Sequence, residues 1–212
     1  MRSIWALSLA AAAAFIGLGV LVDTTRSGNR ALAEDAKPAY IGSDACKKCH
    51  FKQNGSWKKT AMASAFEKLK PGEAAEKKTA GGLDPKADYT KDPKCLKCHT
   101  TGYGTDSGYP AVVEGKAWTP AEEERAKLTA GGTCEACHGP GSLYSPYKKD
   151  HQDFKLADIV SRGATQPPTA EQCKVCHVKE CPTMAKDYAF DFEKAKKSDK
   201  DIHDHVELKF PH

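Results

Sequence analysis

The chain has 212 residues, a formal net charge of +4, 8% aromatic residues and nine cysteines. This length is typical of one domain or two small ones. The low aromatic content leaves little apolar surface to offset the entropy cost of ordering the chain, so we expect something besides side chains to fill the core. Lysines occur as separate doublets and form no basic stripe, which argues against nucleic acid as a partner.

The N-terminus has the features of an export signal. Arg2 precedes an apolar run over residues 4–22, and a small-residue Ala-Leu-Ala cleavage site ends at Ala33. Cleavage there makes residues 1–33 a signal peptide and residues 34–212 the mature domain. The run is also long enough to cross a bilayer, so an uncleaved membrane anchor is the alternative. Both possibilities place the cysteines outside the cytoplasm, and we expect a periplasmic protein.

One short motif, Cys-x-x-Cys-His, occurs four times in the chain. This pattern is the attachment signature of c-type haem. Two cysteines three positions apart lie on one side of a helical turn, so their sulfurs reach one porphyrin, and the next residue binds the iron as proximal ligand. The attachment residues are Cys46, Cys49, Cys95, Cys98, Cys134, Cys137, Cys173 and Cys176, and the proximal ligands are His50, His99, His138 and His177.

Zinc sites and disulfides also use paired cysteines, but neither accounts for the whole motif. Structural zinc sites contain Cys-x-x-Cys pairs, and an oxidising compartment favours disulfides. Neither gives a reason for a histidine directly after each second cysteine. We therefore expect four covalently attached haem c groups, which also supply the missing core. With about 45 residues per haem, the porphyrins must lie close together.

The remaining histidines and methionines are candidates for the second axial ligand of each iron. His151 is favoured because few further candidates exist. His203 and His205 are two residues apart, so on a helix they point away from each other and we expect only one to bind iron. The ninth cysteine, Cys181, belongs to no motif. It is a buried free thiol, half of an intermolecular disulfide or a ligand near the second haem, and the sequence leaves these open.

Two segments outside the motifs read as helices. Residues 56–66 read as a helix ended by a Pro-Gly pair. This segment carries Met62, which from spacing alone is more often a core residue than a ligand. Residues 119–128 read as a capped helix, with Thr119 as the cap and Glu122 as the acid of a capping box.

The chain resembles the tetrahaem cytochrome c-554 family of ammonia-oxidising bacteria over about residues 37–206. Beyond the four motifs, the similar stretches are residues 56–61, 83–85, 88–90, 102–104, 134–141 and 203–205. The resemblance implies a mainly α-helical multihaem cytochrome c with little strand and four haems in two stacked pairs. It also implies an electron carrier. The donor would be a hydroxylamine oxidoreductase-like multihaem enzyme, and the acceptor a membrane quinone-reducing cytochrome or a terminal reductase.

The resemblance also implies a set of distal ligands. His50 would pair with His151 on the first haem, and His177 with His203 on the fourth. The family has a histidine at the position of Met62, so we expect Met62 to bind the third haem. A thioether stabilises ferrous iron relative to imidazole, so that haem should have the highest potential of the four.

The resemblance further implies that the second haem is five-coordinate, with His99 as its only protein ligand. The segment from His177 to Tyr188, which covers this haem in the family, is shorter here, so the pocket is more exposed or is approached by Met184 or Cys181. A five-coordinate iron suggests an alternative function, the reduction of a small molecule such as nitric oxide. No acid that would donate a proton is identifiable beside it, so we expect an electron carrier and not an enzyme.

Overall fold

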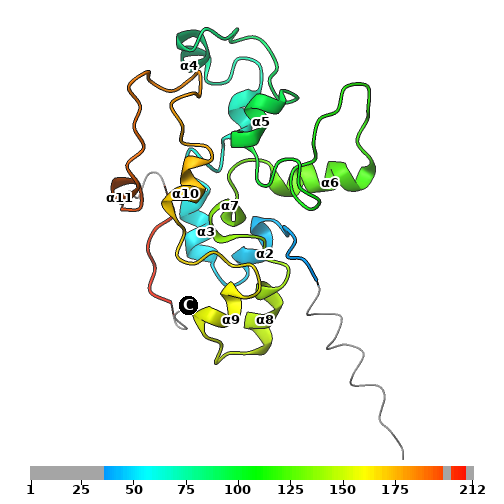
Figure 1. Cartoon of the computed structure of the whole chain (residues 1–212), viewed down its shortest axis with the longest axis vertical. Helices are drawn as coiled ribbons and strands as arrows, with labels where there is room; N and C mark the ends of the chain where they lie inside the picture. Colours follow the sequence, from blue (N-terminus) through cyan, green and yellow to red (C-terminus); the bar gives the residue numbers. More distant parts are fainter. Residues whose placement is uncertain (1–35, 198–201, 209–212) are drawn as a thin grey trace, which may run out of the picture. The chain divides into compact units, whose positions relative to one another are not determined.

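The computed structural model confirms the prediction of a mainly α-helical fold with little strand (Figure 1). The structure describes residues 36–197 and 202–208. The chain divides into one unit up to Ala36 and a second unit from Lys37 to His212. In the described part of the second unit, the β structure amounts to one isolated antiparallel bridge between Thr100 and Ala130.

The predicted signal peptide or membrane anchor lies outside the described residues, since it occupies residues 1–33 with its apolar run at residues 4–22. Over residues 36–197 and 202–208, none of the helices combines the length and the apolarity that crossing a bilayer requires.

The helices of the described residues are short, and two longer segments without helix, residues 100–119 and 175–191, interrupt their sequence. The longest, α6, has 10 residues, and helices of this length are marginal in isolation, so they depend on packing. They are α2 (Ser43–Lys47), α3 (Phe51–Trp57), the 3₁₀ helix η1 (Phe66–Leu69), α4 (Ala75–Ala80), α5 (Pro93–His99), α6 (Pro120–Thr129), α7 (Cys134–His138), α8 (Tyr144–Asp150), α9 (Leu156–Val160), α10 (Ala170–Lys174) and α11 (Phe192–Ala195).

The side-chain core of the described residues is small, as the composition suggested. Its main cluster joins η1, α5 and α6 through Leu69, Leu96, Tyr109 and Ala126. The Tyr109 ring packs edge-on against Trp118, with ring centres 5.5 Å apart. Such a cluster stabilises the part of the fold around the second motif, and little comparable apolar packing surrounds the remaining motifs.

The predicted helix over residues 56–66 is wrong. Helix α3 lies earlier and ends at Trp57, and turns lead from there to η1. The buried Thr60 side chain accepts the Ala63 N–H at 3.2 Å, a local hydrogen bond that competes with the helical pattern.

The predicted capped helix is confirmed as α6. The Glu122 carboxylate accepts the Thr119 N–H at 2.8 Å, and the Thr119 hydroxyl accepts the Glu122 N–H at 3.3 Å. This reciprocal pair satisfies two backbone donors at the start of the helix. Helix α6 ends at Thr129, one residue later than predicted.

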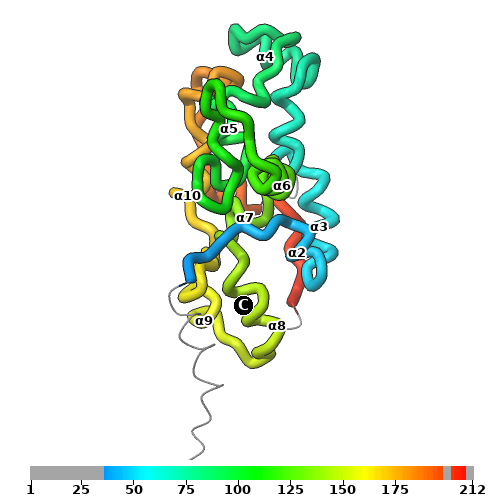
Figure 2. The backbone as a smooth tube through the Cα atoms, turned by 90° about the vertical axis from the view of Figure 1, so that its right-hand side faces the viewer, coloured from blue at the N-terminus to red at the C-terminus, as the bar shows by residue number. Residues whose placement is uncertain are grey.

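Helix α7, which carries the third motif, lies between α2 and α10 in both views of the chain (Figures 1 and 2). Residues 202–208 run alongside α3, where the Asp204 N–H donates to the Ser56 hydroxyl at 2.9 Å (Figure 2). The first, third and fourth motifs and this C-terminal segment are therefore brought to one region of the fold.

Candidate haem-binding site

All four motifs form the same tight helical turn. The second and third motifs lie inside α5 and α7. In the first motif the His50 N–H donates to the Cys46 carbonyl at 2.9 Å, and in the fourth the His177 N–H donates to the Cys173 carbonyl at 3.0 Å. This turn places two sulfurs and an imidazole around one position, as attachment of a c-type haem requires.

N-cap side chains determine where α5 and α10 begin, the two helices that contain the start of the second and fourth motifs. The Asp92 side chain accepts the Lys94 N–H at 2.8 Å and is followed by a proline at the first helical position of α5. A capping box between Thr169 and Gln172 begins α10. Both caps fall a few residues before the first cysteine, so they determine where the motif turn starts.

Three proximal histidines have their Nδ1 atoms engaged within the chain. Their partners are the Ala65 carbonyl for His99 (2.5 Å), the Gln166 amide oxygen for His138 (2.9 Å) and the Tyr188 hydroxyl for His177 (2.8 Å). A metal-binding histidine commonly has this arrangement, because the bond at Nδ1 leaves Nε2 for the metal. Burial also lowers the pKa of His99, which favours the neutral ring that ligation needs. The residues present therefore fit covalent haem c.

The sulfurs of different motifs meet in pairs. A hydrogen bond with Cys46 lowers the pKa of the Cys134 thiol to about 7, and a hydrogen bond with Cys176 lowers that of Cys98 to about 7. Helix α7 also contacts both α2 and α10. The motifs therefore follow one another in space in the order first, third, fourth, second. No two of the nine cysteines are joined by a disulfide, and no three His, Cys, Asp or Glu side chains of the described residues converge as a metal cluster.

A buried network of threonine hydrogen bonds joins the segment after the second motif to the segment before the third. The Gly131 N–H donates to the His99 carbonyl at 3.1 Å, and the Thr101 N–H donates to the Thr129 carbonyl at 2.8 Å. The Thr101 hydroxyl donates to the Gly131 carbonyl at 2.9 Å and accepts the Thr133 N–H at 2.9 Å. Residues just after the second motif are thus tied to residues just before the third.

Glu135 is a structural residue that the sequence analysis missed. It occupies a variable position of the third motif, and it is only 2% exposed. Its carboxylate accepts backbone N–H groups from Ile41 (3.0 Å), Gly42 (2.8 Å) and Gly141 (2.7 Å). A buried carboxylate is tolerated when hydrogen bonds satisfy it, as here. The acid within the motif and the Gly-Pro-Gly turn after it were the available signals.

Comparison with known proteins agrees with this geometry. The family model described as "Cytochrome c554 and c-prime" matches residues 45–139, which include the first three motifs. Cytochrome c-554 of Nitrosomonas europaea is 32% identical over 231 aligned residues, which cover 98% of this chain and 88% of that protein. The chain belongs to the cytochrome c-554 family. The reduced-state structure of cytochrome c554 from Nitrosomonas europaea matches with a TM-score of 0.69 at 31% identity, covering 82% of this chain and 89% of that one.

Family membership confirms the predicted class of protein. This cytochrome is an electron carrier, and its family implies covalently bound haem c. The match to the solved relative extends over most of both chains, so the helical fold is shared and is not confined to the region of the first three motifs.

In this cytochrome the first motif faces α8. The Lys148 ammonium nitrogen lies 3.4 Å from His50 Nε2, the atom that would bind iron. Burial lowers the pKa of Lys148 to about 8. His151, the predicted distal ligand, is exposed, and its ring stacks on Tyr147 with centres 4.1 Å apart. Its assignment to the first haem stays a prediction.

His203 lies beside the third motif of the cytochrome. Its ring centre is 6.0 Å from that of His138, with 24° between the ring planes. The family pairing would instead place it opposite His177, but that ring packs on Phe190, with centres 4.7 Å apart. His205 is exposed, and its Nε2 lies 3.2 Å from the Lys196 carbonyl.

Met62 and Cys181 both lie near attachment motifs. The Met62 carbonyl accepts the Gly132 N–H at 2.9 Å, which places Met62 beside the chain entering the third motif. Cys181 is close enough to Cys95 to contribute to its raised pKa of about 11, although burial is the larger cause. This contact places Cys181 near the second motif, and its role stays a prediction.

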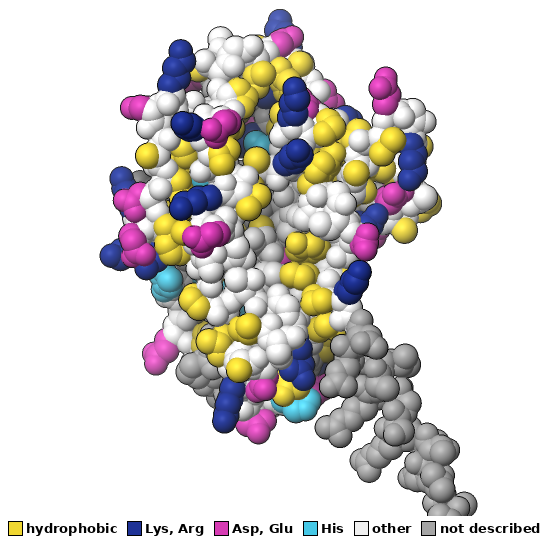
Figure 3. All heavy atoms as spheres, viewed as in Figure 1, with side chains coloured by type: hydrophobic (Ala, Val, Ile, Leu, Met, Phe, Trp, Pro, Cys, Tyr) yellow, Lys and Arg dark blue, Asp and Glu magenta, His cyan; other side chains and the backbone are white. Residues whose placement is uncertain are grey.

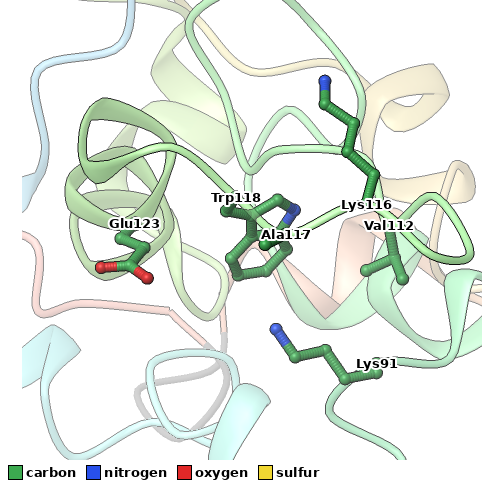
Figure 4. Close-up of a pocket in the computed structure, with 6 residues that line it drawn as sticks. All are labelled: Lys91, Val112, Lys116, Ala117, Trp118 and Glu123. Carbon is green, nitrogen blue, oxygen red and sulfur yellow. The ribbon is translucent and has the colours of Figure 1, made fainter.

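Of the two clearest pockets, one adjoins an attachment motif and the other does not. The larger, of 280 Å³, is lined by Lys91, Val112, Lys116, Ala117, Trp118 and Glu123 (Figure 4). It includes no predicted haem residue, and the Lys91 ammonium lies 3.6 Å from the centre of the Trp118 ring. The smaller, of 210 Å³, lies between α3 and residues 206–208 and includes the attachment residue Cys49. Of these two, the smaller pocket is therefore the one that adjoins a predicted haem.

Proposed function

We propose that this chain is a periplasmic carrier with four haem c groups that moves electrons one at a time between redox partners. The observation that carries this proposal is the set of four motifs, each folded into the turn that attachment requires. Haem iron supplies reversible one-electron chemistry. The chain contributes by attaching, orienting and partly covering the four groups.

The attachment residues would act as pairs within each motif. The thioethers come from Cys46 with Cys49, Cys95 with Cys98, Cys134 with Cys137, and Cys173 with Cys176. His50, His99, His138 and His177 would hold the irons. The Nδ1 contacts of the last three fix the ring orientation and raise the basicity of the ligating nitrogen.

The contacts between motifs support two stacked pairs. The hydrogen-bonded sulfurs Cys46 and Cys134 favour a pair formed by the first and third haems, and Cys98 with Cys176 favour a pair formed by the second and fourth. Contact between α7 and α10 joins the two pairs. An arrangement of this kind suits a carrier, because every attachment point has a near neighbour.

We further propose that the second haem is five-coordinate, with His99 as its protein ligand, and that His151 binds the first haem. Nothing in the described residues favours turnover of a small molecule at the second haem over simple electron carriage. Cyanide or nitric oxide binding would report the open position, and steady consumption of nitric oxide with a supplied reductant would be needed to support an enzyme.

The expected partners are redox proteins. On the basis of its family, we propose that the electron donor is a hydroxylamine oxidoreductase-like enzyme. The acceptor would be a membrane quinone-reducing cytochrome or a terminal reductase. On the face shown in Figure 3, lysines and acidic residues are interspersed and no single sign dominates. Docking would then depend on local charge pairs, and its rate should fall as salt rises. Residues 1–33 would direct export, either cleaved or kept as a tether.

Mass spectrometry of the protein matured in an oxidising compartment tests the haem content. Four haem-sized increments are expected, one on each peptide that contains a motif. A redox titration followed by electron paramagnetic resonance should then show four one-electron centres. A mass equal to that of the bare polypeptide would overturn the proposal.

A further inference from the structure

The first motif lies at one end of the order of the motifs in space. Its helix α2 contacts α7, which carries the third motif, and α7 contacts α10, which contains the first cysteine of the fourth. The Cys98 sulfur of the second motif lies 4.0 Å from the Val175 carbonyl, and the Cys176 sulfur lies 3.9 Å from the Lys97 carbonyl, so the second motif meets the fourth. The first and second haems are therefore the two ends of the series, where a partner would exchange electrons most directly.

Of these two ends, the second motif is the more enclosed. Leu96, between its two cysteines, is 0% exposed, and Thr100 and Thr101 directly after it are buried. Leu96 also belongs to the main side-chain cluster together with Tyr109. The protein's own packing therefore covers much of the second motif, and a partner has less access to it.

The first motif is open to solvent. Cys49 is the only exposed cysteine of the described residues, which include all nine. Phe51, next to the proximal ligand His50, is 64% exposed. Cys49 and Phe51 also line the smaller pocket together with Val206 and Leu208. One attachment point of the first haem therefore lies at the surface, within an apolar patch.

Three exposed lysines accompany this apolar patch. Lys47 and Lys48 lie between the two cysteines of the motif, and Lys52 follows Phe51. The ion pairs of the described residues involve none of these three lysines. An apolar centre with a charged rim is the usual anatomy of a protein–protein interface. We call this surface the first-haem face, and it consists of Lys47, Lys48, Cys49, Phe51 and Lys52.

The fourth motif provides a matched comparison within the same chain. Lys174 and Lys179 stand at the positions that Lys47 and Lys52 occupy around the first motif. Val175 is exposed as well, so an apolar side chain alone does not distinguish the two surfaces. Charge does, because glutamates at both ends of the fourth stretch balance its two lysines, whereas one acid accompanies the three lysines of the first.

We propose that this cytochrome exchanges electrons through the first-haem face with a redox protein whose docking surface is acidic. This rests on the proposed function, because it requires a haem at the first motif. The three lysines steer the acidic surface toward the motif and fix its orientation, and Phe51 supplies the apolar contact. In each transfer one electron leaves the reduced centre of the partner and converts one ferric haem to ferrous.

The first test is stopped-flow reduction of the ferric holoprotein by a reduced, acidic [2Fe–2S] ferredoxin, used as the probe. The double variant Lys47→Glu with Lys52→Glu should lower the second-order rate at low salt by about tenfold or more, because electrostatic steering contributes this much to association. The matched double variant Lys174→Glu with Lys179→Glu should leave the rate nearly unchanged. At about 1 M salt, where screening removes the steering, the difference should disappear.

The second test needs no variant. A carbodiimide joins a carboxylate of the bound ferredoxin to a lysine amine of the unaltered holoprotein, with loss of one water. Mass spectrometry of the peptides then identifies the lysine. We expect the amide bonds on the peptide that contains the first motif, at Lys47, Lys48 or Lys52. This measurement also decides the question if a charge-reversal variant fails to acquire its four haems.

Four results would overturn the proposal. They are equal rates for both double variants, a larger effect of the pair at the fourth motif, cross-links confined to other lysines, and reduction by dithionite without any reduction by the ferredoxin. A protein that takes no electrons from dithionite, or that carries no haem, would instead overturn the proposed function, and this proposal with it.

Discussion

The Glu135 carboxylate accepts the Gly42 backbone N–H at 2.8 Å, between residues 93 positions apart in the sequence. Together with Ile41 and Gly141, this bond ties the start of the second unit to α7 and to the turn after it. The carboxylate therefore holds the chain entering the first motif against the third motif.

Glu135→Gln should destabilise the holoprotein strongly. The substitution replaces one acceptor oxygen by an NH₂ group that faces backbone donors, and hydrogen bonds to a buried charge contribute about 1.5–3 kcal/mol each. We expect a loss of about 3 kcal/mol, or a fall of roughly 6–12 °C in Tm for a domain of this size. Thermal unfolding followed by circular dichroism measures it. Glu114→Gln, at an exposed position, is the control and should leave Tm within about 2 °C.

Thr101→Val should loosen the link between the second and third motifs. The valine has nearly the same shape but leaves the buried Thr133 N–H without its acceptor, and such a loss costs about 1–3 kcal/mol. Chemical denaturation of the holoprotein provides the measurement. Thr79→Val, on the exposed side of α4, makes the same chemical change without a buried partner. Equal midpoints for the two variants would show that the network does not contribute.

The sequence predicted most reliably what depends on short spacing. The motif turns and the capped helix α6 each involve neighbours within a few residues, so their patterns are visible in the chain. The helix over residues 56–66 failed because a single side chain, Thr60, offered the backbone a competing bond. Helix propensity does not account for a side chain that competes with the helical hydrogen bonds in this way.

The remaining features depend on contacts between distant segments. The position of His203 follows from a bond between Asp204 and Ser56, residues 148 positions apart. Spacing alone showed only that His203 and His205 would not both face one iron. The family pattern supplied a pairing, and it assigned His203 to His177, whereas the structure places its ring against His138. Neither the residue spacing nor the family pattern gave information about the Asp204–Ser56 bond that positions this segment.

Variants of His151 and Lys148 test which of the two binds the iron of the first haem as distal ligand. With His151 as distal ligand, His151→Ala should convert one low-spin iron to a high-spin iron that binds cyanide, while Lys148→Met leaves the low-spin count unchanged. The Lys148 amine lies 3.4 Å from His50 Nε2, so it is the competing candidate for the distal ligand of the first haem. Electron paramagnetic resonance distinguishes them. The reverse pattern, with the iron opened by Lys148→Met alone, would assign the site to the amine.

Met62→His tests Met62 as the distal ligand of the third haem by a redox titration. If Met62 does not bind the third iron, an imidazole at position 62 has no iron to join, and all four midpoint potentials should stay nearly unchanged. If the Met62 thioether were the ligand, its replacement by imidazole would lower one potential and leave three unmoved, because a thioether favours ferrous iron. Met62→Leu is the control for packing beside Gly132, and it should lower stability slightly without opening an iron. A single lowered midpoint in Met62→His, together with an opened iron in Met62→Leu, would place the sulfur on the third haem.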